Sequence, residues 1–462
     1  MKTVFVLIPS GYLVRNVLST GILDKLASRS DIRVIALTQS PDEVMSHRQN
    51  NPRLVFEEFP MRSRYNLSNL VNRILRVRFD KINENKALNT LAKKTRVRDP
   101  ASFFLDTLIS QPFPRSRRIY NWIRTIGERG DGVLDEIQSL FDLYSPSLVL
   151  ATNPTRMVEY PFLKYAKQTG ITTVGMIKSW DVMLTKGYIP ILTDYYLVWT
   201  PIMKKDLMKF HDVADEFIGV TGVPQFDIYS ESIPISRRDE FLSQLGLDPR
   251  KKTILFSTSS PWIGIQEPKI LNSLAQSLIE NKSSQHVQIL ARLHPLDDPL
   301  RYEDIHHPNL VYQIPGLPTD TNDEERFLDP NYITLLRDAL ACSDLVINTA
   351  STMTLEAAAL DKPVVNLALD LEPTDYWQSS QRYYEFEHYL PIVNSGAVKI
   401  ARTLDELVAM SLRYLDAPHL EEQERGELRK MMCYKLDGRS AQRVADHLFC
   451  VLDGKPFSEV FR

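Results

Sequence analysis

The stretch SDLVINTASTMTLEAAALDKPVVN, from Ser343 to Asn366, has the pattern of a strand, a hydroxyl-rich turn, a helix and a second strand. Leu345 to Ile347 is apolar enough for a buried strand, and Met353 to Leu360 has helical composition. Pro363 ends the helix, and the next strand begins at Val364. These residues therefore predict a parallel crossover unit with the start of its helix at the end of a strand.

The turn of this unit is rich in hydroxyl groups, because Thr349, Ser351 and Thr352 lie within four residues. A helix N-terminus presents backbone N–H groups, and with added hydroxyls it suits an anion such as a diphosphate. Glu356 lies about one turn into the helix, where its carboxylate can accept hydrogen bonds from a ribose. The alternative is structural, namely that Ser351 or Thr352 only caps the helix.

The rest of the chain predicts an α/β protein with more than one domain. A chain of 462 residues exceeds one core of usual size, and its 43% hydrophobic and 24% charged content is ordinary for a globular protein. Short apolar strands alternate with helices in both halves, which favours parallel sheets. We expect strands at 4–8, 32–37, 54–59, 147–151, 172–177, 195–199, 252–259, 287–293, 310–313, 345–348 and 364–367.

Residues 62–130 interrupt this alternation with a basic segment. They hold 16 Lys and Arg against 5 Asp and Glu, with apolar side chains interleaved, which predicts one or more amphipathic helices. Two interpretations stay open: a solvated helical insertion, or a face that meets anionic lipid or an anionic acceptor. The net charge of -3 gives no reason to expect a nucleic-acid partner.

Two further clusters follow strands in the second half. Arg292-Leu-His-Pro295 places a cation and an imidazole at a strand end, and Pro295 fixes the backbone around His294. An imidazole there can bind or protonate a leaving phosphate. Ser259, in the run Phe256-Ser-Thr-Ser-Ser260, is a second candidate contact for a phosphate or sugar. Each cluster is also compatible with an ordinary turn.

Two clusters in the first half suit an acceptor. Ser179, Trp180 and Asp181 follow a strand, where the indole can stack on a sugar and the carboxylate can act as a general base. Gly222 permits a tight backbone near a ligand. The structural alternatives are that Trp180 anchors a loop that Asp181 caps, and that Gly222 belongs to a domain-closing turn.

Several absences narrow the possibilities. The sequence has no Walker A motif, no G-x-G-x-x-G, no H-E-x-x-H and no C-x-x-C among its three cysteines, so neither a cofactor nor a metal is predicted. The apolar N-terminal run is short for a signal peptide, and no stretch approaches the roughly 20 residues that span a bilayer. We therefore expect a cytoplasmic protein, with peripheral attachment at the inner face of the plasma membrane as an option.

Together these motifs resemble the GT-B glycosyltransferase architecture, in which two Rossmann-like domains face each other across a cleft. The Arg292-Leu-His-Pro295 turn and the Ser351-Thr352…Glu356 segment are similar to the HP and Ser/Thr motifs of bacterial surface-polysaccharide transferases. That group includes sialyl- and Kdo-transferases and the CDP-glycerol glycerophosphotransferases. The resemblance is clearest over residues 145–230 and 252–370.

The resemblance implies a metal-independent glycosyltransferase that takes a nucleotide-activated sugar and modifies a cell-surface glycan or a lipid-linked acceptor. It implies an acceptor domain over 1–232, a linker over 233–250, a donor domain over 251–430 and a closing helix over 431–462. Arg292, His294, Ser259, Ser351, Thr352 and Glu356 would then serve the donor, and Asp181 would be the base. Three alternatives stay open: a CDP-glycerol-type phosphotransferase, a nucleotide-sugar 2-epimerase, and a non-catalytic scaffold.

Overall fold

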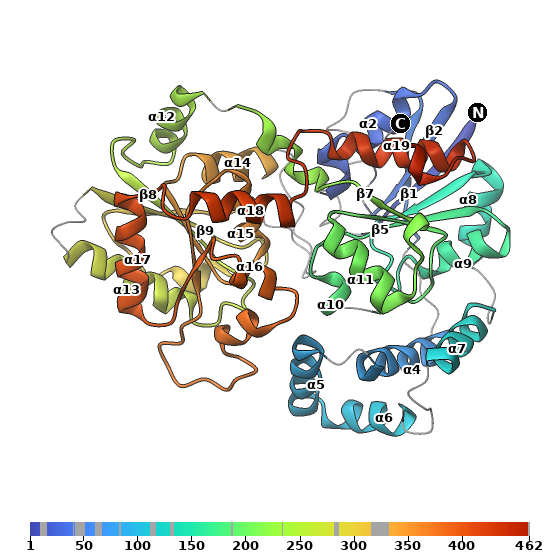
Figure 1. Ribbon diagram of the computed structural model, residues 1–462, viewed down its shortest axis with the longest axis horizontal. Coiled ribbons are helices and arrows are strands. Elements are labelled where there is room, and N and C mark those ends of the chain that lie inside the picture. Colours follow the sequence, from blue (N-terminus) through green and yellow to red (C-terminus); the bar gives the residue numbers. More distant parts are fainter. Residues whose placement is uncertain are drawn as a thin grey trace. The chain divides into compact units, whose positions relative to one another are not determined.

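The computed structural model divides the chain into two compact units (Figure 1). Unit 1 comprises residues 1–224 and 439–462, and unit 2 comprises residues 225–438. The structure describes all residues except 10–15, 40, 42–50, 61–66, 83–84, 111–116, 130–133, 186–187, 233, 281–285, 316–331 and 461–462. The predicted division placed the boundary at 232 and treated the C-terminal segment as a separate closing helix.

Unit 1 is built on a parallel sheet of seven strands among its described residues, in the order β3-β2-β1-β4-β5-β6-β7. The strands alternate with helices that cover both faces, and the centre of the sheet is fully buried. The strands are β1 Lys2–Ile8, β2 Ile32–Thr38, β3 Leu54–Glu58, β4 Leu148–Ala151, β5 Thr172–Met176, β6 Tyr195–Val198 and β7 Ile218–Val220. The helices are η1 Leu18–Thr20, α2 Ile22–Ser28, α8 Asp135–Tyr144, α9 Tyr160–Gln168, α10 Val182–Thr185, α11 Pro201–His211 and η2 Asp215–Phe217.

Unit 2 repeats this plan with a parallel sheet of six described strands in the order β10-β9-β8-β11-β12-β13. Numbered within the unit, the order is 3-2-1-4-5-6, which is the doubly wound Rossmann order. The strands are β8 Lys252–Ser257, β9 Val287–Arg292, β10 Leu310–Gln313, β11 Leu345–Asn348, β12 Val364–Leu367 and β13 Lys399–Ala401. The helices are η3 Pro224–Ser230, α12 Ile235–Gln244, α13 Glu267–Glu280, η5 Pro299–Tyr302, α14 Tyr332–Ala341, α15 Thr352–Ala359, η6 Ser380–Glu385, α16 Leu390–Asn394, α17 Leu404–Asp416 and α18 Glu422–Met432.

The basic segment forms four helices of unit 1, α4 Leu67–Ile82, α5 Lys86–Arg98, α6 Pro100–Ser110 and α7 Arg117–Arg129. A small apolar cluster attaches them to the rest of the unit, since the Phe79 ring stacks on the His211 ring at 4.9 Å between centroids. Asn85 caps α5, and its Nδ2 donates to the carbonyl oxygen of Leu184 at 3.0 Å. The expectation of amphipathic helices over 62–130 agrees with these elements.

Helix α19, Ser440–Leu452, returns the end of the described chain to unit 1, where it packs beside α2 (Figure 1). Val444 and Leu448 are fully buried in the same core as β1 and β2. Lys2 Nζ donates to the carbonyl oxygen of Leu452 at 2.5 Å, and Arg29 pairs with Asp453 at 2.8 Å. Helix α19 is therefore part of the core of unit 1.

Candidate functional site

The register of the unit 2 sheet brings three predicted motifs to one edge. Ser257, the last residue of β8, pairs with Arg292 of β9 on one side and with Asn348 of β11 on the other. Because the strands are parallel, the loops that begin at residues 258, 293 and 349 all leave the carboxyl end of the sheet. This edge includes the point between β8 and β11 where the strand order reverses, which is the usual ligand position in such sheets.

Hydrogen bonds tie these three loops together. Thr258 Oγ1 accepts from the backbone N–H of His294 at 2.8 Å, which links the loops after β8 and β9. Ser259 Oγ donates to the carbonyl oxygen of Thr349 at 3.4 Å, which links the loops after β8 and β11. The predicted donor-side residues therefore lie on one connected platform.

Two buried acids, neither predicted from the sequence, accept hydrogen bonds from this platform. Glu267 Oε1 accepts from Thr349 Oγ1 at 2.6 Å, and its Oε2 accepts from the Ser259 N–H at 2.7 Å. Asp297 Oδ2 accepts from Thr258 Oγ1 at 3.1 Å and from the Tyr302 hydroxyl at 2.8 Å. Burial raises the pKa of Glu267 to about 7, although these hydrogen bonds oppose the shift.

Close packing supports the position of Glu267. A Cβ added at Gly264 would lie 2.0 Å from Glu267 Oε2, so a side chain at residue 264 would displace the carboxylate. In the structure Glu267 is an acid in the first turn of α13, and such acids are too ordinary there to mark a site from the sequence.

The imidazole of His294 has a defined tautomer in its neutral form. Its Nδ1 accepts the backbone N–H of Leu296 at 3.0 Å, so the ring proton is on Nε2. Pro295 lies between these two residues and restricts the turn. An Nε2–H donor at the end of β9 has the chemistry needed to bind a phosphate oxygen.

The guanidinium of Arg292 is buried and only partly satisfied. Its Nη1 donates to Gln313 Oε1, and its Cζ lies 5.0 Å from the centroid of the Tyr332 ring. Its Nη2 has no hydrogen-bond partner among the residues that the structure describes. A buried donor without a partner is costly, so an oxygen-rich ligand would stabilise this edge of the sheet.

The start of α15 is more fully satisfied than the sequence predicted. Ser351 is the N-cap, and its Oγ accepts from the Met353 N–H at 3.0 Å. The Thr354 N–H donates to the Ser351 carbonyl oxygen at 3.1 Å, and the Ala350 N–H donates to the Tyr384 hydroxyl at 3.1 Å. The capping role of Ser351 is therefore present, and a phosphate contact by Ser351 or Thr352 stays a prediction.

A buried polar network holds the first turn of α15 against the sheet. Thr354 Oγ1 donates to Asn348 Oδ1 and accepts from Asn366 Nδ2, each at 3.0 Å. The Tyr389 hydroxyl donates to Asn366 Oδ1 at 2.8 Å. A network of this kind fixes the angle at which α15 leaves β11.

Glu356 already has a protein partner. It is 1% exposed, and its Oε2 accepts from the Tyr229 hydroxyl at 2.7 Å. Tyr229 belongs to η3, in the segment that enters unit 2 from unit 1. A ribose contact at Glu356 stays a prediction, and it requires the Tyr229 hydrogen bond to be exchanged for one from the sugar.

The Ser179-Trp180-Asp181 cluster has the structural arrangement that was the alternative in the sequence. Asp181 Oδ1 accepts from Ser179 Oγ at 2.5 Å, and its Oδ2 accepts from Thr185 Oγ1 at 3.1 Å, while its backbone carbonyl oxygen accepts the first N–H bonds of α10. Trp180 is 6% exposed. Sugar stacking by Trp180 and base catalysis by Asp181 stay predictions.

Glu159 is a second buried acid at a sheet edge, this time in unit 1. It follows β4, whose Ala151 pairs with Leu7 of β1 at the point where this strand order reverses. Its carboxylate accepts from the N–H groups of Thr152 and Asn153 at distances from 3.0 to 3.2 Å. Burial raises the pKa of Glu159 to about 8, against the opposing effect of these hydrogen bonds.

Gly222 has a structural reason to be glycine. Its φ is +83°, and an added Cβ would lie 2.6 Å from Ser440 Oγ at the start of α19. Arg443 Nη1 also donates to the carbonyl oxygen of Thr221 at 3.1 Å. This turn therefore seats the C-terminal helix in unit 1, which was the alternative to an acceptor contact.

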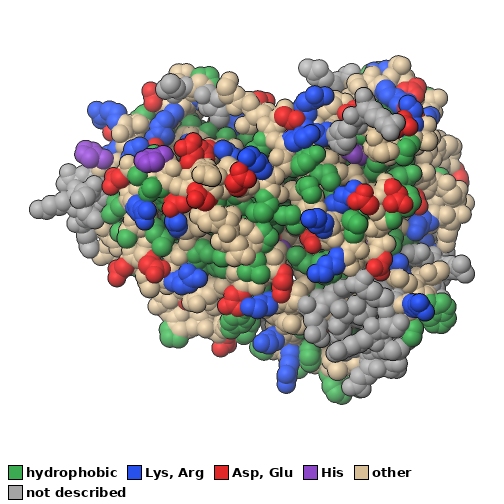
Figure 2. Space-filling view, in the orientation of Figure 1, with side chains coloured by type: hydrophobic (Ala, Val, Ile, Leu, Met, Phe, Trp, Pro, Cys, Tyr) green, Lys and Arg blue, Asp and Glu red, His purple; other side chains and the backbone are tan. Residues whose placement is uncertain are grey.

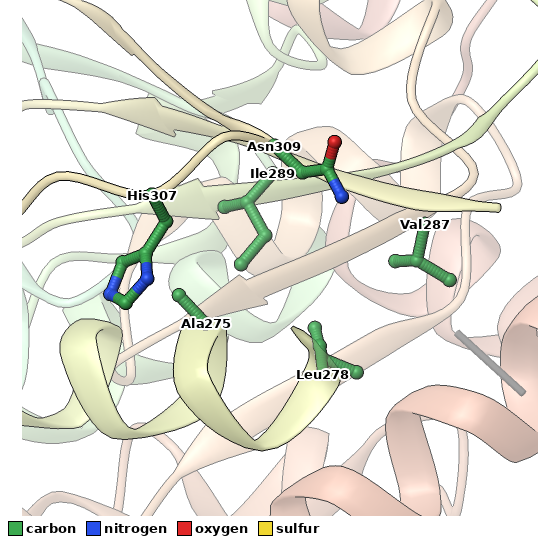
Figure 3. A pocket seen from close by; sticks show the side chains of 6 residues that line it. All are labelled: Ala275, Leu278, Val287, Ile289, His307 and Asn309. Carbon is green, nitrogen blue, oxygen red and sulfur yellow. The ribbon is translucent and has the colours of Figure 1, made fainter. Parts of the chain in front are cut away.

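Two hollows in unit 2 differ in their relation to this platform. Figure 3 shows the first, between α13 and the beginnings of β9 and β10, lined by Ala275, Leu278, Val287, Ile289, His307 and Asn309. Val287 is the first residue of β9, so this mostly apolar hollow lies away from the carboxyl edge. The second adjoins the platform and is lined by residues that include Gly264, Glu267, Thr349, Asp370 and Ser380.

Solved structures share this architecture at low sequence identity. The UDP co-structure of MnaA from Staphylococcus aureus is 12% identical, with 98% of this chain and 97% of that chain covered and a TM-score of 0.58. The calicheamicin glycosyltransferase CalG4 is 13% identical, with 98% of both chains covered and a TM-score of 0.51. Two Rossmann-type sheets with this strand order and these neighbours define a GT-B protein.

The family follows from the sequence comparison. The model of the CDP-glycerol:poly(glycerophosphate) glycerophosphotransferase family matches residues 188–450, which is more than half of the chain. The chain therefore belongs to that family. The match includes all of unit 2, the last two strands of unit 1 and most of α19.

Curated relatives are similar over part of their length. A processive diacylglycerol beta-glucosyltransferase from Staphylococcus epidermidis is 27% identical over 231 residues, which are 49% of this chain and 56% of the relative. The teichoic acid ribitol-phosphate polymerase TarL from Staphylococcus aureus is 25% identical over 276 residues, 57% of this chain and 41% of the relative. The chain thus spans about half of the length of the relatives it matches.

Proposed function

We propose that the protein is a transferase that binds a nucleotide-activated sugar in unit 2 and transfers the sugar to a cell-surface glycan or lipid-linked acceptor. The observation that carries this proposal is the platform at the ends of β8, β9 and β11, where Ser259, His294 and the start of α15 are tied together. Family membership and the names of the relatives support it.

In this proposal the residues of unit 2 bind and neutralise the nucleotide that departs. His294 donates from Nε2 to a phosphate oxygen, Arg292 supplies a fixed cation, and the dipole of α15 favours the negative charge. Because these groups balance a diphosphate, we propose that transfer needs no metal. On the acceptor side, Asp181 of unit 1 is the proposed base, and it must exchange its hydrogen bond to Ser179 for one to the acceptor hydroxyl.

The family match favours a second candidate on the same platform. A CDP-glycerol-type phosphotransferase would also release a nucleotide, so the groups around His294 would have the same task. The similarity to a ribitol-phosphate polymerase supports this candidate. The two candidates differ in the group that moves, a sugar in one case and a polyol phosphate in the other.

Location is part of the proposal. Among the described residues, no helix combines the length and the apolar character needed to cross a bilayer. We propose that the protein acts in the cytoplasm and meets lipid-linked acceptors at the membrane surface.

A donor screen tests the proposal. The full chain is heated with CDP-glycerol, CMP-sugars or UDP-sugars, and the unfolding temperature is compared with that of the free protein. Stabilisation by a sugar donor, followed by sugar transfer to an acceptor in the presence of EDTA, is the expected result. Stabilisation by CDP-glycerol alone selects the phosphotransferase.

Two other results would contradict both candidates. Conversion of the donor without any acceptor would identify an epimerase, and it is detected by analysis of the sugar product. If no nucleotide raised the unfolding temperature, the interpretation as a non-catalytic scaffold would be favoured instead.

A further inference from the structure

Helix α6 is oriented with its apolar face outward. Asp106 points toward α4, where its Oδ1 accepts from Arg73 Nε at 2.5 Å. On the opposite side of the helix, Phe104, Leu105 and Leu108 are 64%, 44% and 47% exposed. With Ala101 they follow the i, i+3, i+4, i+7 spacing of one helical face. An amphipathic helix of a globular protein normally turns this face inward, so the exposed face implies a partner.

The surroundings of α6 are positively charged. Lys93 and Arg96 are exposed on α5, which packs against α6. In Figure 2 a few blue and green side chains lie near one another at the lower edge of the view.

This combination selects one kind of partner. Apolar and aromatic side chains can enter the boundary between lipid headgroups and acyl chains, while Lys and Arg bind anionic headgroups. A protein partner would cover the apolar face. It would not by itself explain why residues 62–130 contain 16 basic and only 5 acidic residues.

We propose that the outer face of α6, with Lys93 and Arg96 beside it, inserts into the surface of an anionic lipid bilayer. The proposal deepens the membrane location given above, but it does not depend on the donor platform. Loss of lipid binding and loss of nucleotide binding can therefore be observed separately.

Flotation of the full chain with vesicles tests this surface. We expect binding to vesicles that contain phosphatidylglycerol in phosphatidylcholine, and little binding to phosphatidylcholine alone. The double variant Phe104→Gln/Leu108→Gln removes apolar insertion and should weaken binding about tenfold or more. Lys93→Gln/Arg96→Gln should weaken it by a similar factor, with less dependence on salt.

Matched controls lie elsewhere on unit 1. Leu143→Gln changes a leucine on α8 that is 70% exposed, and Lys205→Gln changes an exposed lysine on α11; both should bind vesicles like the wild type. Circular dichroism and thermal unfolding establish that each variant is folded. The proposal is overturned if the wild type does not bind anionic vesicles, or if both double variants bind them like the wild type. It is also overturned if Phe104→Gln/Leu108→Gln instead converts an oligomer to a monomer.

Discussion

His294 shows how one side chain can serve both the backbone and a ligand. Its Nδ1 accepts the Leu296 N–H, which shapes the turn and leaves the ring proton on Nε2. The two nitrogens therefore have separate roles, a structural one and a chemical one. Substitutions that mimic one nitrogen at a time can distinguish the two roles.

We expect His294→Asn to retain the fold and lose transfer. The asparagine oxygen can replace Nδ1 as the acceptor for Leu296, but no group replaces the Nε2 donor. The loss of one preorganised donor to the leaving phosphate should lower kcat by about 10²-fold or more. His294→Gln is the matched variant, which places its amide near Nε2 and should keep more activity but unfold at a lower temperature. Wild-type kcat in His294→Asn would exclude the proposed role.

Glu267 predicts a specific pH dependence of stability. Burial raises its pKa from the ordinary value of 4.5 to about 7, so the folded protein holds this proton more tightly than the unfolded chain. The resulting stabilisation is complete below pH 4.5 and is lost as the pH rises through about 7. It amounts to about 3 kcal/mol, from the size of the shift.

Glu267→Gln should remove this dependence. The glutamine Oε1 can accept from the Ser259 N–H while its Nε2 donates to Thr349 Oγ1, as the protonated acid would. Melting curves from pH 5.5 to 8.5 should therefore show a smaller loss of stability for the variant than for the wild type, and the loss that stays in the variant is expected from Glu159, whose pKa burial also raises. The exposed Glu303→Gln serves as the control, and an unchanged slope in Glu267→Gln would contradict the assignment.

At the scale of elements, the turn at Gly222 determines how α19 docks. We expect Gly222→Ala to destabilise unit 1 more than Gly170→Ala, although both glycines have positive φ, +83° and +71°. Each alanine pays roughly 1–2 kcal/mol for a left-handed backbone. Only the one at 222 meets Ser440, which adds about 1–3 kcal/mol. If urea unfolding gave the same loss of unfolding free energy for both variants, then α19 would shift to accommodate the alanine at 222 without loss of stability.

Most strands were predictable because buried parallel strands are continuous apolar runs. The predicted range 345–348 coincides with β11, and 310–313 coincides with β10. The strands β7 and β13 were missed because each has only three residues, too few for a pattern to emerge. The end of β7 was instead interpreted as part of the glycine turn at Gly222.

Part of the candidate site could be predicted from the sequence, namely the residues that directly follow strands. Ser259, His294 and Ser351 follow strands, and strand ends can be located from hydrophobic patterns. Glu267 and Asp297 act through contacts with loops of other strands, and only the sheet register reveals those contacts. The burial of Trp180 and the hydrogen bond from Tyr229 to Glu356 also depend on tertiary contacts that the sequence pattern does not reveal.

At the scale of the whole molecule, the two units should respond separately to a core substitution. Leu448→Ala in α19 removes a fully buried side chain from the core of unit 1 and should cost about 2–5 kcal/mol there. Hydrogen exchange should quicken in β1, β2 and α2, while nucleotide still protects the loops after β8, β9 and β11. Leu274→Ala is the counterpart in the core of unit 2. Lost protection of those loops in Leu448→Ala would contradict this independence.

The return of α19 to unit 1 has a consequence for synthesis on the ribosome. Every residue of unit 2 emerges before residues 440–452, which complete the first core. We therefore expect the second unit to reach its native structure first, while β1 and β2 wait with an uncovered apolar face. A chaperone that binds nascent chains would then be needed most by the part of the protein that is made earliest.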